Sequence, residues 1–307
     1  MVEISLVENF LPIFLQYHSD SDNKDHTLSC AIGNGYKIFC YDGDKVKTLS
    51  KILGKLLCVN YDPSLVFLFR GEPADRRRLL DETISMISSE YLLAISRYKK
   101  LIKERNAAMA KEYDQEIIDV LRNELIRLSY KIVKERKQVI KELSKKVSEY
   151  YLKLFSGEKK LTLRYKTNCP IVETEKEFTD QALDLFDKNK TVEALRGQTL
   201  IGPHRDDLTA LLDKDDVSAY GSQGENRLAS LSLKLAVRDL LTEKLNEVPI
   251  LLLDDVTSDL DQVRSLNLLK AVKEKGQVIV TGTKIPDGYD EYTVLQTDGK
   301  TVIRRES

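Results

Sequence analysis

The fold of this chain is decided by one stretch, Ile250-Leu251-Leu252-Leu253-Asp254-Asp255. A short apolar run of this kind is typical of a strand that is buried on both faces, and here two carboxylates end it. In an open α/β sheet, the carboxyl ends of the strands form the edge where ligands bind. The stretch therefore predicts an acidic ligand-binding edge. The alternative is an Asx-type turn that only ends the strand.

The segments on either side of this strand favour the ligand-binding edge over the simple turn. Val256-Thr257-Ser258-Asp259-Leu260-Asp261 follows directly, and Gly221-Ser222-Gln223-Gly224-Glu225 opens a helix predicted from Gly224 to Asn246. A serine hydroxyl and free N–H groups at a helix start can hold a phosphate, although a merely capped helix start has the same composition. The helix start at 221–225, the strand at 250–255 and the segment at 256–261 follow one another in the order of the signature, Walker B and D-loop segments of ABC-type ATPases, which they resemble. In P-loop NTPases the first acid after such a strand helps to hold Mg²⁺, and a second acid can orient water.

Strand and helix signals alternate along the rest of the chain. Turn residues at 33–35 and 42–44 predict hairpins. Strands are predicted at Thr27–Ile32, Tyr36–Tyr41, Leu56–Asn60, Leu65–Phe69, Leu161–Tyr165, Leu208–Leu212 and Gln277–Thr281. Helices are predicted near Asp180–Asp187 and over Asp261–Glu274. This alternation predicts an α/β fold with a parallel or mixed sheet covered by helices.

A helical segment from Asp81 to Phe155 interrupts that alternation. Its apolar residues recur in steps of three, four and seven from Ile118 to Leu154, which places them on one side of a long helix. The heptad pattern lapses near Glu135–Arg136, so packing within one chain is favoured over a dimeric coiled coil. The predicted organisation is residues 1–80 and 161–307 as two parts of one α/β lobe, with residues 81–160 as an inserted helical lobe.

Composition sets further bounds. The chain has 307 residues, of which 42% are hydrophobic and 32% charged, a balance typical of a globular protein. It contains no apolar stretch long enough to cross a membrane, and its first residues do not resemble a secretory signal. The four cysteines (Cys30, Cys40, Cys58 and Cys169) have no metal-like spacing. These features predict a cytoplasmic protein with reduced thiols.

Four further segments have a recognisable pattern. They are Gly202-Pro203-His204-Arg205-Asp206-Asp207-Leu208, Ser222–Ala236, Gly71–Asp81 with the pattern G-x-P-x-x-R-R-x-x-L-D, and residues 91–106. They resemble, in that order, the GPHRDDL segment, the signature helix, the G-x-P-x-x-R-R-x-x-L-D segment and the start of the helical lobe of the RecF family, DNA-repair ATPases of the ABC/SMC type. The resemblance covers Leu53–Thr283 in five ordered segments.

The resemblance implies an ABC/SMC-type ATPase head that dimerises around ATP and Mg²⁺. It implies binding to DNA at junctions between single and double strands, and help in loading recombinase through mediator proteins of the RecO/RecR type. By position, Asp254 would ligate Mg²⁺ and Asp255 would replace the catalytic glutamate of many relatives. Thr281 or Thr283 would occupy the switch position.

The remaining carried-over residues belong to the signature and the D-loop. The signature residues would contact the γ-phosphate held by the opposite subunit of a dimer, and they are Ser222, Gln223, Gly224 and Glu225. Ser258 and Asp261 would belong to the D-loop.

The hypothesis of DNA binding rests on an uneven charge distribution. Residues 91–160 carry 18 Lys and Arg against 10 Asp and Glu, a net charge of +8, and the remaining 30 basic and 39 acidic residues give −9. A solvated, lysine-rich helix surface is the alternative explanation. The candidate DNA contacts are Arg76, Arg77, Arg97, Lys99, Lys100, Lys103 and Arg105. Arg76 and Arg77 have an alternative role, anchoring the lobe junction through carboxylates such as Asp81.

The segment His204-Arg205-Asp206-Asp207 also has two interpretations. It has the residue types of a metal or acid/base cluster. A structural turn with internal ion pairs is favoured, because a single histidine supplies too few metal ligands.

A phosphate-binding loop of the form G-x-x-x-x-G-K-[ST] is missing from this sequence. Gly54-Lys55 is followed by Leu56, and Gly299-Lys300-Thr301 has valine where the first glycine belongs and fits a hairpin turn. In the resembled family the loop lies near the N-terminus, and truncation is favoured over true loss. We therefore expect this chain alone neither to bind ATP tightly nor to hydrolyse it, although the family is a weak ATPase. The alternative function is a degenerate or truncated head that serves as a non-catalytic DNA-binding or scaffold subunit.

Overall fold

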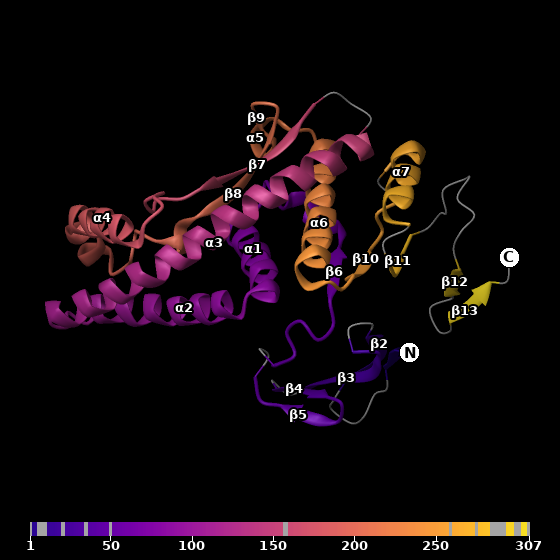
Figure 1. The fold of residues 1–307 in the computed structure, drawn as a ribbon, viewed down its shortest axis with the longest axis horizontal. Helices are drawn as coiled ribbons and strands as arrows, with labels where there is room; N and C mark the ends of the chain where they lie inside the picture. The colour runs from indigo at the N-terminus through magenta and orange to yellow at the C-terminus, as the bar shows by residue number, and fades with distance from the viewer. Residues whose placement is uncertain are drawn as a thin grey trace.

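The computed structural model describes residues 2–4, 11–19, 22–33, 36–48, 51–155, 159–257, 260–273, 276–282, 293–297 and 302–305. A helical arm extends to one side of the molecule, formed by α2 (Ser89–Ala110), α3 (Gln115–Phe155) and α4 (Glu175–Arg196) (Figure 1). The arm joins a body of small sheets and helices, and an antiparallel sheet near the N-terminus lies below that body in the same view.

The N-terminal sheet is a meander in which each strand pairs antiparallel with the next one along the chain. Its strands are β1 (Val2–Ile4), β2 (Leu11–Ser19), β3 (Lys24–Gly33), β4 (Tyr36–Tyr41) and β5 (Asp44–Val46). The strands predicted at residues 27–32 and 36–41 are confirmed as parts of β3 and β4. The predicted turn at residues 42–44 joins β4 to β5, where Asp42 and Gly43 both have positive φ.

A parallel sheet carries the deciding stretch. Its three strands lie in the order β11 (Val278–Val280), β10 (Ile250–Leu253) and β6 (Cys58–Tyr61). Leu251 and Leu253 are almost fully buried, as expected of a central strand. The predicted strand at 250–253 and the predicted helices beside it are confirmed, the helices as α6 (Gln223–Leu245) and α7 (Gln262–Val272).

One predicted strand is wrong. Residues 65–69 belong in part to a 3₁₀ helix, η2 (Pro63–Phe67), rather than to a strand. Pro63 presets the first helical position, and the Asp62 side chain accepts the Ser64 N–H at 3.0 Å, which caps the helix start. The apolar run that suggested a strand packs instead on α6, with Val66 buried.

The helical segment contains three helices, and the first, α1 (Pro73–Ile87), begins eight residues before the predicted start because a proline opens it. α3 has 41 residues, a length of about 60 Å at 1.5 Å per residue. Its predicted apolar stripe is buried, with Ile132, Leu143 and Val147 all inaccessible. Because α3 packs mainly on α6 and α2 of the same chain, packing within the chain is confirmed.

A second three-stranded sheet is not joined to the parallel sheet by strand pairing. It contains β7 (Leu161–Lys166), β8 (Asp207–Leu212) and β9 (Asp215–Asp216), all antiparallel, and α5 (Val217–Tyr220) follows it. The predicted strands at 161–165 and 208–212 are therefore confirmed, but they do not extend the sheet of β10. A two-residue turn joins β8 to β9, and so short a connection allows only antiparallel pairing.

The first Gly-Lys pair does not form a phosphate-binding loop. Gly54 and Lys55 precede β6, whereas such a loop follows a strand and opens a helix. The turn predicted at residues 299–301 lies outside the described residues, but the strands that flank it, β12 (Val294–Thr297) and β13 (Val302–Arg305), pair antiparallel. Within the described parts of the chain, no helix has both the length and the apolar character needed to cross a bilayer.

Candidate nucleotide-binding half-site

The predicted acidic edge forms where β10 ends. The Asp254 N–H donates to Tyr61 O of β6 at 2.9 Å, and the Thr281 N–H donates to Leu253 O at 2.9 Å. Both neighbouring strands thus hold the end of β10 in place. The Asp254 side chain is exposed and that of Asp255 is half-buried, so the first carboxylate is open to a ligand.

Thr281 ties the two acidic residues together. Its hydroxyl donates to Asp254 Oδ1 at 2.5 Å and accepts the Asp255 N–H at 3.0 Å. Asp255 has a φ of 48°, in the left-handed region that aspartate tolerates better than most residues. The predicted switch position is therefore in direct contact with the predicted metal ligand.

These side chains fit part of a Mg²⁺ site. An exposed carboxylate and a hydroxyl at a sheet edge provide the oxygen ligands that Mg²⁺ prefers. In the part of the chain that the structure describes, no group of three or more His, Cys, Asp or Glu residues is placed to hold a metal. Protein-bound Mg²⁺ commonly takes most of its ligands from water and phosphate oxygens, so one carboxylate is compatible with such a site.

The predicted signature residues form the start of α6. Ser222 caps the helix by accepting the Glu225 N–H at 3.2 Å, and Glu225 Oε2 accepts the Ser222 N–H at 2.8 Å, a reciprocal capping box. The Lys159 ammonium group also donates to Glu225 Oε1, at 2.9 Å. The hydrogen bond from the Ser222 backbone, and to a smaller extent that from Lys159, hold the pKa of Glu225 below its ordinary value. Ser222, Gln223 and Gly224 are exposed, so the positive end of the helix dipole faces solvent.

Only one of the two predicted D-loop residues can be placed. Asp261 caps α7 by accepting the Arg264 N–H at 2.9 Å and also contacts Arg264 Nε at 3.3 Å. Its exposed carboxylate thus has a local structural role. Ser258 and Thr283, the second switch candidate, lie outside the described residues.

Arg76 and Arg77 lie at the junction between α1 and the turn before β8. The Arg76 guanidinium is buried and contacts both Asp207 carboxylate oxygens, at 2.7 and 3.0 Å. Arg77 donates to the Asp206 carbonyl at 2.8 Å. Anchoring through a carboxylate is thereby confirmed for Arg76, with Asp207 rather than Asp81 as the partner, whereas Arg77 is anchored by a backbone carbonyl. A buried Arg76 cannot reach a DNA phosphate.

Arg136, which lies at the centre of this junction, was not among the residues predicted from the sequence. The side chain is 1% exposed and donates to Asp81 Oδ1, Asp206 Oδ2 and the Pro203 carbonyl, each at 2.7 Å. Burial raises the pKa of Asp81, but Arg136 and Lys99 outweigh burial and hold it below the ordinary value. The signal for this residue was present in the sequence, because the heptad pattern of α3 lapses at 135–136.

His204 has a structural role in the same turn. Its Nε2 lies 2.9 Å from the Thr199 carbonyl, so that nitrogen donates, and Nδ1 can then accept from the Tyr98 hydroxyl at 2.7 Å. Burial lowers the pKa of His204 to about 4, which keeps the ring neutral near pH 7. The structural turn is confirmed for this segment, but the prediction of internal ion pairs is wrong, because Asp206 and Asp207 pair with the distant Arg136 and Arg76.

The remaining basic candidates all lie on α2. Arg97, Lys99, Lys100 and Lys103 are exposed, and Lys99 pairs with Asp81 at 2.9 Å. Arg105 is buried and donates to Glu193 Oε2 at 2.7 Å and to Thr199 Oγ1 at 2.8 Å. Like Arg76, it cannot contact DNA directly in this structure.

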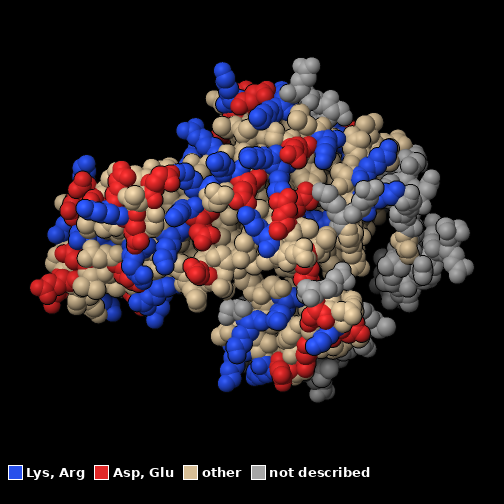
Figure 2. Space-filling view, viewed as in Figure 1, with Lys and Arg blue, Asp and Glu red and all other residues tan. Residues whose placement is uncertain are grey.

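A basic groove that the sequence analysis did not single out lies between α3 and β7. Its volume is about 640 Å³, and four lysines line it, Lys137, Lys141, Lys145 and Lys160, with Glu149 as the one acidic lining residue. The three lysines of α3 are four residues apart and therefore share one face of the helix. Figure 2 shows that basic and acidic side chains are mixed over the viewed face of the molecule, so this local excess of lysine is not part of a uniformly basic surface.

Comparisons with known proteins agree with this architecture. No family model matches the chain. The chain is 38% identical over 255 residues to the DNA replication and repair protein RecF of Bacillus velezensis, covering 81% of this chain and 69% of the relative. It is 34% identical over 270 residues to RecF of Halalkalibacterium halodurans, covering 86% and 72%.

A solved structure gives the same answer. The recombination mediator protein RecF of the RecFOR pathway, solved with ATP, superposes with a TM-score of 0.86 at 26% identity and covers 98% of this chain and 82% of its own. The resemblance predicted from the sequence motifs is therefore confirmed. On its sequence and its fold, this chain belongs to the RecF family of DNA replication and repair proteins.

Proposed function

We propose that this chain acts in recombinational DNA repair by binding DNA at junctions between single and double strands. In this role it assists mediators of the RecO/RecR type in loading recombinase. The support is its membership of a family named for DNA replication and repair, with a solved relative that is a recombination mediator of the RecFOR pathway. The four cysteines, all free thiols, agree with the cytoplasmic location that this role requires.

The observation that carries the DNA-binding part is the groove between α3 and β7. Lys141, Lys145 and Lys160 are exposed, and no ion pair is described for any of them. A row of uncompensated lysines attracts phosphates and releases counterions on binding, without reading the base sequence. We therefore propose these lysines as the principal DNA contacts. Arg97, Lys100 and Lys103 of α2 remain secondary candidates.

Salt dependence tests this proposal. The variant Lys141→Gln/Lys145→Gln is compared with the wild type for binding to a gapped duplex at several salt concentrations. Loss of two phosphate contacts should reduce the slope of log K against log salt by about 2. The matched control is Lys176→Gln/Lys188→Gln, which removes two exposed lysines of α4. An unchanged slope in the groove variant, or an equal loss in the control, would rule the groove out.

The nucleotide part of the proposal is a half-site. Asp254 would hold Mg²⁺ with Thr281 orienting its carboxylate, and the exposed start of α6 would contact the γ-phosphate. ATP would supply the phosphate that joins two subunits. The phosphate-binding loop would come from an opposite subunit that carries one, such as an intact relative, because a second copy of this sequence has none either.

Nucleotide turnover tests the half-site. The purified chain should show no ATP hydrolysis above background. Hydrolysis that Asp255→Ala abolished would contradict this expectation. The positive arm adds RecF of Bacillus subtilis, which is 37% identical, and measures association of the two proteins with and without ATP. Association that requires ATP supports the half-site, and association independent of ATP contradicts it.

A further inference from the structure

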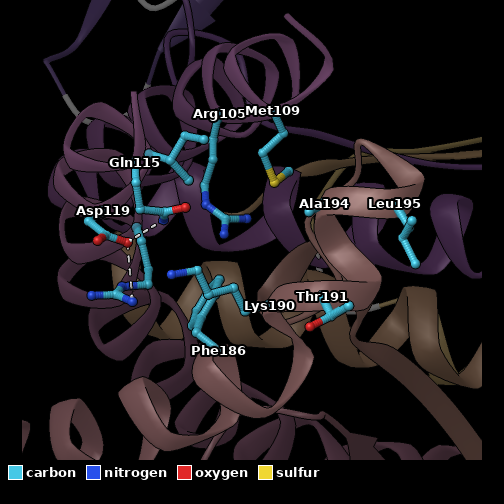
Figure 3. A pocket seen from close by; sticks show the side chains of 11 residues that line it. Arg105, Met109, Gln115, Asp119, Phe186, Lys190, Thr191, Ala194 and Leu195 are labelled. Carbon is cyan, nitrogen blue, oxygen red and sulfur yellow. Dashed lines mark hydrogen bonds and ion pairs between the residues drawn. The ribbon is translucent and has the colours of Figure 1, made fainter. Parts of the chain in front are cut away.

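A separate cavity, open to solvent on one side, lies in the helical arm and is lined by residues of α2, α3 and α4. Its volume is about 370 Å³, which falls within the range of small-molecule sites. Figure 3 shows Arg105 and Met109 of α2 facing Phe186 and Lys190 of α4, with Gln115 and Asp119 of α3 to one side. None of these residues belongs to the nucleotide half-site or to the groove beside β7.

The lining of this cavity is apolar on its inner side. Met109 and Phe186 are buried, and Ile118 adds a third apolar side chain. At the rim, Leu195 is 84% exposed, more than any other large apolar residue in the described structure. An apolar or aromatic group that entered the cavity would cover Leu195 and lie against the buried side chains.

The lining itself carries more basic than acidic side chains. Three cations (Arg105, Arg122 and Lys190) and one carboxylate (Asp119) line the cavity, a net charge of +2. Asp119 is already paired with Arg122 at 3.3 Å, so its charge is compensated within the protein. Two carboxylates next to the lining cancel this excess, because Arg122 also pairs with Asp187 and Arg105 with Glu193. Lys190 is then the lining cation for which no ion pair is described.

Lys190 and Arg105 are the two cations with unused capacity. No hydrogen bond or ion pair is described for the Lys190 ammonium group, which is exposed at the cavity. The Arg105 guanidinium lies 5.1 Å from the centre of the Phe186 ring, and its buried Nε has no hydrogen-bond partner in the described structure. A buried donor without an acceptor destabilises a protein, so a nearby negative charge would be favourable.

We propose that this cavity binds a small organic anion, a carboxylate or phosphate joined to an apolar or aromatic body. The anionic group pairs with Lys190 in the field of Arg105, and the apolar body packs on Phe186 and Leu195. An apolar pocket with a few placed charges is the usual composition of a ligand site. The proposal does not depend on the proposed function in DNA repair, because it involves neither the half-site nor the groove.

The experiment compares three probes on the full chain by ligand-observed NMR titration, namely phenyl phosphate, phenol and inorganic phosphate. We expect phenyl phosphate to bind more tightly than either of the others, because only it offers both the anion and the apolar body. Equal binding of phenol would overturn the role of charge. Equal binding of inorganic phosphate would show a simple ion site and overturn the organic ligand.

Three variants locate the binding. Lys190→Gln should weaken phenyl phosphate about tenfold, the loss expected for one charge-assisted contact, without changing the binding of phenol. Ala194→Trp, at an exposed position of the lining, should block both aromatic probes by filling the cavity. The control Lys188→Gln removes an exposed lysine of the same helix that does not line the cavity, and it should change nothing. Binding that survives Ala194→Trp, or falls equally with Lys188→Gln, overturns the proposal.

Discussion

Arg136 and Asp206 form an ion pair inside the protein, with Arg136 Nη1 2.7 Å from Asp206 Oδ2 and each side chain no more than 2% exposed. The two residues are 70 positions apart in the sequence and connect α3 to the turn that precedes β8. Arg136 also contacts Asp81 of α1, so one guanidinium joins three parts of the chain. Tyr165 donates a further hydrogen bond to Asp206.

Removing this arginine should destabilise the protein severely. Arg136→Leu leaves the Asp206 carboxylate buried without its cation and leaves Asp81 with only the exposed Lys99, and breaking a buried pair in this way costs about 3–5 kcal/mol. Urea unfolding of the variant measures the loss. Arg127→Leu is the control, because its ion pair with Glu124 lies on the surface and contributes at most about 1 kcal/mol. A loss below 1 kcal/mol for Arg136→Leu would show that the junction does not depend on this charge.

His204 should make the stability of the protein sensitive to mild acid. Its folded-state pKa of about 4 lies below the unfolded value of 6.5, so between these pH values the unfolded chain binds more protons. The free energy of unfolding therefore falls as pH decreases from 6.5 to 4, by at most about 3 kcal/mol at 1.36 kcal/mol per unit. His204→Gln, which cannot titrate, should flatten that part of the profile in urea unfolding.

A second histidine acts in the opposite direction and provides the comparison. The carboxylates of Asp42 and Asp22 contact His26 and raise its pKa, so its contribution is present in acid and is lost as pH rises through the folded value. His26→Gln should therefore lower stability in acid rather than preserve it. If the two variants have the same pH profile, the assignment of the acid-sensitive step to His204 is wrong.

The two possible roles of Ser222 can be separated by substitution. Ser222→Ala removes the side-chain acceptor of the capping box and should cost about 1 kcal/mol of stability. Ser222→Asp keeps an acceptor at the cap but places a negative charge where a phosphate would bind. We expect Ser222→Asp to unfold at the same urea concentration as the wild type and to lose ATP-dependent association with the Bacillus subtilis relative. Association that tolerates the aspartate would leave Ser222 with its capping role alone.

The sequence predicted the strand and the helix that carry the proposed half-site better than it predicted the basic surface, and the reason is physical. The strand at 250–253 and the helix at 223–245 follow from local apolar periodicity, which reports directly which faces are buried. Burial of a charge depends on a distant partner, such as Asp207, which lies 131 positions after Arg76. The spacing of neighbouring residues does not show which distant side chains will pair in the folded protein. Two of the seven proposed DNA contacts, Arg76 and Arg105, were therefore placed on a surface that they do not reach.

The same limit explains the error at residues 65–69. Five consecutive apolar residues satisfied the pattern of a short strand, but Asp62 and Pro63, which lie just before them in the chain, start a 3₁₀ helix. At residues 65–69 a regular pattern was misleading, whereas the lapse in the heptad at Glu135–Arg136 was an irregularity that carried information. It was used to argue against a coiled coil, whereas it also marked the most completely buried arginine of α3. A break in a regular pattern thus deserves to be tested as a buried polar site.

Two glycines near the functional segments should respond oppositely to alanine. Gly202 has a φ of 136°, and a Cβ there would lie 2.1 Å from the Tyr98 hydroxyl oxygen, so Gly202→Ala adds backbone strain to a steric clash. At Gly224 a Cβ would meet no atom closer than Ser222 Oγ at 4.0 Å, and alanine favours the helix more than glycine does. Gly202→Ala should therefore lose about 2 kcal/mol or more in urea unfolding, whereas Gly224→Ala should match or exceed the wild type.

Gly224→Ala separates an effect on ligand binding from an effect on folding. A Cβ at position 224 would contact no other part of the protein closely, so folding does not require glycine there. If a fully stable Gly224→Ala variant loses ATP-dependent association, the added methyl group must therefore interfere with a ligand or partner that binds at the exposed start of α6. That result would support close approach of a phosphate to the helix start, since a methyl group there blocks access to the backbone N–H groups. Unchanged association would mean that no ligand comes close to Gly224, and the signature role of this helix start would have to be abandoned.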